Sequence, residues 1–167
     1  MSRLALPWDF AGKVKEFLKP HTRLLFLGEG EALLPFRHPP KLTTLAGQGP
    51  FCPYLAPMGV EAVPYHPEGH MPLPLGDGEF DLAVAWYAPY DLAQIHRVLK
   101  AGGFFLTQQV GGAESRGAPP DYNLENQLPK FQAAGFRVMY ANQAYPAERA
   151  GDREVRRHRF AVIGKKT

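Results

Sequence analysis

Residues 73–110 have the sequence LPLGDGEFDLAVAWYAPYDLAQIHRVLKAGGFFLTQQV, and this stretch decides the fold. Two near-continuous apolar runs, Asp81 to Trp86 and Phe104 to Val110, predict strands covered on both faces. Between them, Asp91 is expected to cap an amphipathic helix that Gly102 and Gly103 end. A strand, a crossover helix and a strand of this length form a right-handed βαβ unit, so we predict an α/β protein built on a parallel sheet.

Other apolar runs predict the rest of the sheet. The linker Tyr145 to Arg156 is too short and too polar for a crossover helix, so the strands on either side of it should be antiparallel neighbours. Asp9 is expected to cap an N-terminal helix that Pro20 stops, and a later helix either begins near Pro129 or is kinked there. The remaining strands are expected at Arg23–Leu27, Lys41–Ala46, Val60–Tyr65, Phe136–Ala144 and Arg157–Gly164.

A chain of 167 residues supports one hydrophobic core, so we expect one domain, with an N-terminal helix in residues 1–20 and an α/β core in residues 21–167. No apolar run approaches the ~20 residues that span a bilayer, and no secretory signal is visible at the N-terminus. The single cysteine, Cys52, excludes an internal disulfide and a multi-cysteine metal site, which suits the cytoplasm. His66 and His70 flank Pro67 and Gly69, so we expect loop histidines and no metal site.

The basic residues gather at the C-terminal end. Residues 149–167 contain seven Lys and Arg against Asp152 and Glu154, a net charge of +5, so the rest of the chain carries −2 of the total of +3. Such a segment is able to contact RNA phosphates. The alternative, a solvated hairpin edge protected by charge, is favoured because no aromatic-rich RNA motif accompanies it. No DNA-binding motif is present either.

The order of motifs in residues 73–110 resembles the second half of the core of class I S-adenosylmethionine (SAM)-dependent methyltransferases. RVLKAGG, residues 97–103, is similar to their R-x-L-K-P-G-G signature, with Ala101 in the place of proline. The resemblance implies one Rossmann-like, doubly wound domain of about seven strands, mostly parallel with an antiparallel last strand. It also implies SAM as the cofactor.

The family's first motif, D-x-G-x-G-x-G, is matched in part after the first strand. Gly28, Glu29 and Gly30 form the glycine-rich turn, but Phe26 stands in the place of the acid that holds the methionine end of SAM. The acid that holds the ribose is also missing after Ala46, where Gln48 is the only nearby polar substitute. We therefore predict that SAM is bound weakly or not at all.

Other candidate ligand contacts follow from position in the predicted sheet. Glu68 lies near the place where the family contacts the adenine amino group. Trp86 and Tyr87 follow the fourth strand and border the predicted pocket. Trp86 and Tyr87 are cofactor-contact candidates, and Tyr90 is a substrate-pocket candidate. Tyr87 and Tyr90 are suited to stack on the cofactor or on a planar substrate; the alternative, which is favoured, is that they pack the lip of the sheet. The polar pair Gln108 and Gln109, at the carboxyl end of a strand, are also substrate-pocket candidates.

Two functions are open at this point. The first is a SAM-dependent methyltransferase, which catalyses by positioning and needs no catalytic acid or base, so the catalytic residues and the methyl acceptor are unknown. The second is a non-catalytic protein of the same fold that has lost tight SAM binding and serves as a binding or assembly partner. Whether the chain is an enzyme stays undecided, because fold does not determine function.

Overall fold

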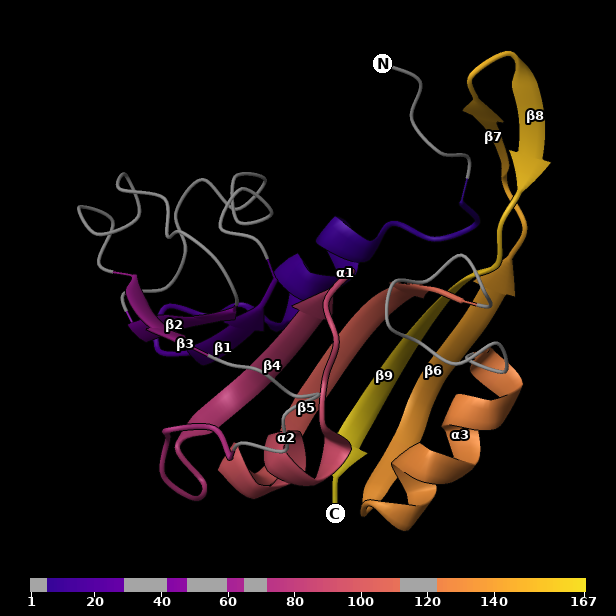
Figure 1. Ribbon diagram of the computed structural model, residues 1–167. Helices are drawn as coiled ribbons and strands as arrows, with labels where there is room; N and C mark the ends of the chain where they lie inside the picture. The colour runs from indigo at the N-terminus through magenta and orange to yellow at the C-terminus, as the bar shows by residue number, and fades with distance from the viewer. Residues whose placement is uncertain (1–5, 29–41, 48–59, 65–71, 112–122) are drawn as a thin grey trace.

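The computed structural model describes residues 6–28, 42–47, 60–64, 72–111 and 123–167, in which seven strands form one twisted sheet (Figure 1). The strand order is β3-β2-β1-β4-β5-β9-β6. The strands are β1 (Arg23–Leu27), β2 (Leu42–Gly47), β3 (Glu61–Pro64), β4 (Phe80–Trp86), β5 (Leu99–Val110), β6 (Phe136–Ala144) and β9 (Arg159–Lys166). Seven strands in one sheet confirm the predicted doubly wound fold.

All pairs from β3 to β5 are parallel, whereas β9 is antiparallel to both of its neighbours. The sheet is therefore mostly parallel with an antiparallel last strand, as predicted. β1 and β6 have the predicted bounds, and the ends of the other strands differ from the predicted ones by up to five residues. β2, β3 and β9 begin at Leu42, Glu61 and Arg159, and β5 begins already at Leu99.

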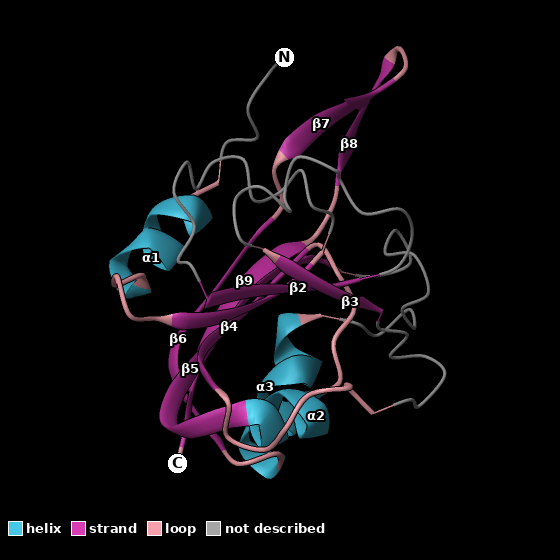
Figure 2. Cartoon of the chain, turned by 90° about the vertical axis from the view of Figure 1, so that its left-hand side faces the viewer, coloured by secondary structure: helices cyan, strands magenta, loops and turns pink. Residues whose placement is uncertain are grey.

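Helices cover both faces of the sheet (Figure 2). Helix α1 (Phe10–Phe17) lies on one face, where Phe10 and Val14 belong to an apolar cluster with alternate residues of the strands. Helices α2 (Leu92–Val98) and α3 (Leu124–Ala133) lie on the other, where Ile95 and Phe131 join a second cluster. The central strand β4 is buried by both clusters, which explains its near-continuous apolar sequence.

The predicted end of α2 was wrong. The helix stops at Val98, and Leu99 has extended backbone angles, so Gly102 and Gly103 lie inside β5. A Cβ on Gly103 would lie 2.9 Å from the carbonyl oxygen of Lys100 and 3.1 Å from that of Asp81. These glycines therefore let the chain bend closely against β4 as it enters the sheet, and they do not end a helix.

Helix α3 begins at Leu124, five residues before Pro129, where one of the two predicted alternatives placed its start. Asn123 caps it by accepting a hydrogen bond from the N–H of Asn126 at 2.9 Å, and the helix runs through Pro129 to Ala133. A start near Pro129 was therefore wrong. A proline at this position removes one N–H from the helix, so packing of Phe131 and Leu124 into the core must sustain the helix.

The linker between β6 and β9 forms a β-hairpin that the sequence did not predict as strands. β7 (Ala147–Ala150) and β8 (Arg153–Arg156) pair antiparallel and project beyond the sheet (Figure 1). The pair Ala147–Arg156 continues the register of the pair Ala144–Arg159, three residues further along each strand. We call residues 147–156 the arm; it extends the β6–β9 ribbon past the carboxyl edge of the sheet.

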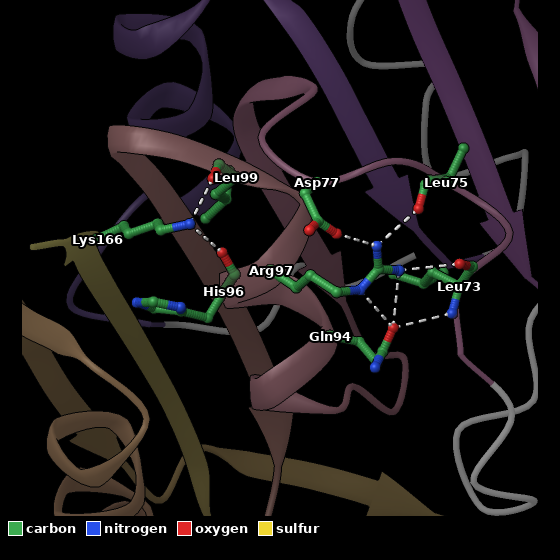
Figure 3. A network of polar contacts seen from close by, with 8 residues as sticks. All are labelled: Leu73, Leu75, Asp77, Gln94, His96, Arg97, Leu99 and Lys166. Carbon is green, nitrogen blue, oxygen red and sulfur yellow. Dashed lines mark hydrogen bonds and ion pairs between the residues drawn. The ribbon is translucent and has the colours of Figure 1, made fainter.

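Arg97 of the RVLKAGG signature ties α2 to the segment that enters β4 (Figure 3). Its guanidinium donates to the carbonyl oxygens of Leu75 and Leu73 at 2.8 and 3.0 Å and to the Oδ1 atom of Asp77 at 2.7 Å. Two further nitrogen contacts reach Gln94 Oε1, which also accepts from the Leu73 N–H. Arg97 therefore organises backbone, and the signature serves the fold.

Lys166 closes the same region from the C-terminal strand. Its Nζ donates to the carbonyl oxygens of His96 and Leu99 at 2.7 and 2.8 Å, which belong to the last turn and cap of α2 (Figure 3). Those carbonyls have no partner inside the helix, and an ammonium also suits the negative end of the helix dipole. One lysine thus satisfies two backbone acceptors.

We expect Arg97→Ala to lower the free energy of unfolding by about 2 kcal/mol, because several hydrogen bonds from a charged, partly buried donor are lost. Arg97→Lys should lose most of the same free energy, since one ammonium cannot bridge carbonyls that a guanidinium fork spans. Urea denaturation measures both. Arg153→Ala on the arm is the matched control and should change little; full stability in Arg97→Lys would contradict the fork explanation.

Candidate functional site

The strand order reverses between β1 and β4. The chain proceeds from β1 through β2 to β3 on one side and from β4 to β5 on the other. Ligands of open parallel sheets bind beyond the carboxyl ends of the strands at such a reversal. The candidate site is therefore the region beyond the carboxyl ends of β1 and β4, next to Gly28 and residues 87–91, and we call this region the crevice.

Gly28 lies where the carboxyl ends of three strands meet. Its N–H donates to the carbonyl oxygen of Ala46 at 3.3 Å, and its φ is +150°. A Cβ at this position would lie 3.2 Å from the Phe26 ring and 3.3 Å from the carbonyl oxygen of Trp86. Glycine therefore lets the chain turn between these groups after β1, where a side chain would meet the Phe26 ring and the Trp86 carbonyl oxygen.

Phe26 fills the position that the family gives to a carboxylate. Its side chain is fully buried and belongs to the apolar cluster between α1 and the sheet. Ala46, at the end of β2, is 1% exposed and belongs to the cluster on the opposite face. Both residues are therefore surrounded by apolar side chains. A charged group at either position would be desolvated.

Tyr87 has a strained backbone at the edge of the crevice. Its φ is +52°, a left-handed conformation that non-glycine residues rarely adopt and that costs ~1 to 3 kcal/mol. Its N–H donates to the carbonyl oxygen of Gln108 at 2.9 Å, and its side chain is 45% exposed. The fold thus holds an aromatic ring and a hydroxyl at the crevice despite the strain.

Gln108 fixes the Tyr87 hydroxyl. Its Oε1 accepts from Trp8 Nε1 at 2.6 Å, and its Nε2 donates to the Tyr87 hydroxyl at 2.6 Å. Trp8 and Gln108 are almost fully buried. The chain Trp8–Gln108–Tyr87 therefore brings together the N-terminal segment, β5 and the residue after β4, and it leaves the hydroxyl proton of Tyr87 free to donate.

Gln109 and Tyr90 point to the opposite face. Gln109 Nε2 donates to the carbonyl oxygen of Ala88 and to Thr107 Oγ1, both at 2.8 Å, and Thr107 donates to the carbonyl oxygen of Ala85. Tyr90 packs edge-on against Phe105 and donates to Gln127 Oε1 at 3.2 Å. Both side chains brace the loop after β4, which matches the lip-packing alternative for Tyr90.

Trp86 is half-buried and packs edge-on against Phe10 of α1, with ring centroids 5.2 Å apart. It therefore anchors the start of the loop that carries Tyr87. Four predicted cofactor contacts lie outside the described residues: Glu29, Gly30, Gln48 and Glu68. His66 and His70 lie outside them as well. Among the described residues no group of His, Cys, Asp or Glu is arranged to hold a metal ion.

The C-terminal basic residues do not form one patch. Arg149, Arg153 and Arg156 are exposed on the arm. At the base of the arm, the Glu148 carboxylate is shared between Arg159, which is 5% exposed, and Arg157 at 3.8 Å. The two lysines lie at the far end of β9. Predicted RNA contact through this segment is therefore divided among three places on the molecule.

His158 lies between the arm and β9. Its Nε2 accepts a hydrogen bond from the N–H of Leu124 at 3.3 Å, so the neutral ring carries its proton on Nδ1. Burial, and then the nearby positive charge of Arg159, lower the pKa of His158 below its ordinary value of 6.5. His96, which burial and Lys166 affect in the same direction, also has a lowered pKa.

A shallow hollow of about 320 Å³ lies at the opposite, amino edge of the sheet. Phe17, Thr22 and Phe104 contribute to its lining, as do Asp81 and Lys100, which form an ion pair at 3.3 Å. Asp81 also accepts from the N–H of Arg23 at 2.9 Å. These charges already have protein partners, so we assign the candidate site to the carboxyl edge.

Sequence reasoning missed Trp8 and Arg159 as neighbours of the site. The Arg159 guanidinium carbon lies 6.0 Å from the centroid of the Tyr87 ring, and Glu148 pairs with this arginine. Trp8 reaches Gln108 across 100 residues of sequence, and no local pattern signals such a contact. Arg159 was counted only as a surface charge. The sequence did contain a signal that Arg159 is buried, because it directly precedes the apolar run of residues 160–163 in a core strand.

The chain matches no model of a known protein family and no curated protein. It is similar to solved structures. A SAM-dependent methyltransferase from Aquifex aeolicus has a TM-score of 0.63 at 19% identity, over 95% of this chain and 90% of that one. A SAM-dependent methyltransferase from Methanosarcina mazei has a TM-score of 0.60 at 13% identity, over 92% and 96%.

The [4+2]-cyclase SpnF is a further neighbour, with a TM-score of 0.67 at 19% identity over 93% of this chain and 79% of that one. These similarities show that the chain has the fold of class I SAM-dependent methyltransferases. Since a cyclase is among the neighbours, the fold alone does not define the chemistry. No described helix is long and apolar enough to cross a membrane.

We expect the two lowered histidine pKa values to make the fold acid-sensitive. The unfolded chain takes up protons near pH 6.5 and the folded chain only at lower pH, so stability is highest above about pH 7 and falls as the pH decreases from 6.5. Urea midpoints at pH 7.5 and 5.0 measure the loss. The loss of stability at pH 5.0 should be smaller in His158→Gln and in His96→Gln. It should persist in His21→Gln, the control, which changes an exposed histidine. An equal loss in all three variants would refute the role of His96 and His158.

Proposed function

We propose that the protein is a SAM-dependent methyltransferase of low cofactor affinity, which binds SAM between β1 and β4 and receives its acceptor beside Tyr87. The observation that carries this proposal is Gly28, whose positive φ and lack of a Cβ let the chain turn tightly at the point where the strand order reverses. A nucleoside can approach such a turn closely. The shared fold supports the same cofactor.

The described residues suit the nucleoside better than the methionine end of SAM. An ammonium needs a carboxylate, and Phe26 supplies only a buried ring. Several described carboxylates near the carboxyl edge already have structural roles: Asp9 caps α1, Asp91 caps α2 and Glu148 pairs with two arginines. Low affinity follows because one charge-assisted contact contributes roughly 1.5 to 3 kcal/mol.

The chemistry required of the chain is mainly positioning. Bound SAM supplies an electrophilic methyl group, which an acceptor nucleophile must approach in line. Gln108 fixes the Tyr87 hydroxyl at the crevice, and the free proton of that hydroxyl is suited to hydrogen bond an acceptor oxygen or nitrogen. The Tyr87 ring is 45% exposed, with the Arg159 guanidinium carbon 6.0 Å from its centroid, and its exposed part offers a surface for the acceptor. The methyl acceptor is not assigned. A single cysteine, Cys52, is typical of proteins in a reducing compartment, which favours a cytoplasmic enzyme.

A second function is favoured by one observation. Phe26 is 0% exposed and sits within 3.2 Å of the Cβ position of Gly28, so an apolar ring replaces the cofactor's charge partner inside the turn. Such packing suits a protein that kept the fold and lost the cofactor, acting as a binding or assembly partner.

Comparing SAM with 5′-methylthioadenosine, which lacks the amino acid end, separates these functions. With a carboxylate for the ammonium, SAM would bind roughly 10- to 100-fold more tightly than the truncated nucleoside. We expect isothermal titration to show millimolar or high micromolar binding of both, with affinities that differ by less than about tenfold. Tight, SAM-selective binding would contradict low affinity, and no binding of either would favour the second function.

A glycine pair provides the control for the location of the site. Gly28→Ala should abolish nucleoside binding, because the added methyl group enters the space next to Phe26 and Trp86. Gly151→Ala imposes a comparable strained backbone, at φ +70°, where a Cβ meets nothing within 4 Å. It lies at the tip of the arm and should leave binding unchanged. Equal binding by both variants would remove Gly28 from the site.

A further inference from the structure

Three cations lie on the sheet face next to α1, where the described residues give them no carboxylate partner. Lys165 of β9 lies directly opposite Arg137 of β6 and opposite Phe104 of β5. Directly opposed residues of antiparallel strands point to the same face, so all three side chains share it. Lys13 of α1 completes the set, with its Nζ 3.8 Å from the ring centroid of Tyr140. We call Lys13, Arg137 and Lys165 the basic face.

Tyr140 connects the basic face along the sheet. It pairs with Ile163, two residues from Lys165 on β9, so its ring points to the same face as that lysine. The Lys165 Nζ lies 5.7 Å from the Phe104 ring centroid. Aromatic rings therefore hold both ammonium groups, those of Lys13 and Lys165, against the sheet, and these groups are ordered before any partner arrives.

The basic face is electrostatically unfavourable in the free protein. Like charges on directly opposed residues of neighbouring strands destabilise a sheet, and Arg137 and Lys165 form such a pair. Glu16 of α1 is the described acid nearest in sequence to this helix face, and it forms no ion pair with any described cation at 4.0 Å or less. An anionic partner would remove the repulsion.

We propose that the basic face binds the phosphate backbone of a single-stranded nucleic acid. The cations come from β6, β9 and α1 on one side of the twisted sheet, and such a row of positive charge is able to follow the flexible backbone of a single strand. Rings already covered by Lys13 and Lys165 are poorly available for base stacking, so recognition is through phosphates and independent of base sequence. This inference is independent of the proposed function, since SAM binds at the carboxyl edge.

The arm offers a matched control. It carries three exposed arginines, but it also carries three acids, Glu148, Asp152 and Glu154, and is therefore neutral as a whole. Removing three charges from the arm or from the basic face changes the net charge equally. The arm set is Arg149→Gln, Arg153→Gln and Arg156→Gln, and the face set is Lys13→Gln, Arg137→Gln and Lys165→Gln.

Fluorescence anisotropy with a labelled 12-nucleotide oligouridylate tests the proposal. Three phosphate contacts on a single strand predict a slope of about −2 for log K against log salt, which is a roughly 20-fold loss of affinity between 50 and 200 mM salt. The face set should remove most of that slope, and the arm set should retain it. Loss in the arm set alone, or binding that does not depend on salt, would overturn the proposal.

Two further probes and one stability measurement distinguish other partners. A 12-base-pair duplex that binds more tightly than the single strand, or vesicles of anionic lipid that bind while the oligonucleotide does not, would each overturn it. In the free protein, Arg137→Gln alone should raise the melting temperature by about 1 to 3 °C at low salt, because the repulsion with Lys165 is removed. A lower melting temperature would show that the opposed pair is already neutralised.

Discussion

The pairing of β1 with β4 is the constraint on which the other elements depend. Both strands are buried on both faces, so neither can leave its backbone groups unpaired, and each must have a strand on either side. β2 supplies the outer neighbour of β1, and β5 supplies that of β4. Because the chain departs in opposite directions from this pair, the crevice with Gly28 and Tyr87 forms between their carboxyl ends.

The RVLKAGG signature, which resembles that of methyltransferases, has a structural role in this fold. Arg97 fixes the backbone before β4, Lys100 pairs with Asp81, and Gly103 permits β5 to approach that strand. None of these groups lies at the crevice. The residues that would contact SAM belong to other segments, and there the sequence has Phe26 and Ala46 in place of acids. Retention of one set does not require retention of the other, so the fold does not determine the affinity for SAM.

Elements with a strong local pattern were predictable from sequence. β1 and β6 have the predicted bounds, because an apolar run defines β1 and Gly135 precedes β6. The helix caps at Asp9 and Asp91 and the turn at Gly28 follow from the local chemistry of these residue types. The arm was not predictable as strands, because its ten residues alternate charges and bury little. The Trp8–Gln108–Tyr87 chain was not predictable either, because its two hydrogen bonds join residues that are 100 and 21 positions apart in the sequence.

The common register of the β6–β9 ribbon and the arm restricts how this part of the chain can change in length. One residue inserted into either strand of the arm would turn every later side chain to the opposite face, and it would separate Glu148 from Arg159 at the base. Residues added in equal numbers on both sides of the turn at Gly151 would leave β9 undisturbed. The ribbon thus tolerates growth at its tip, where a longer arm would reach further over the carboxyl edge without altering the core.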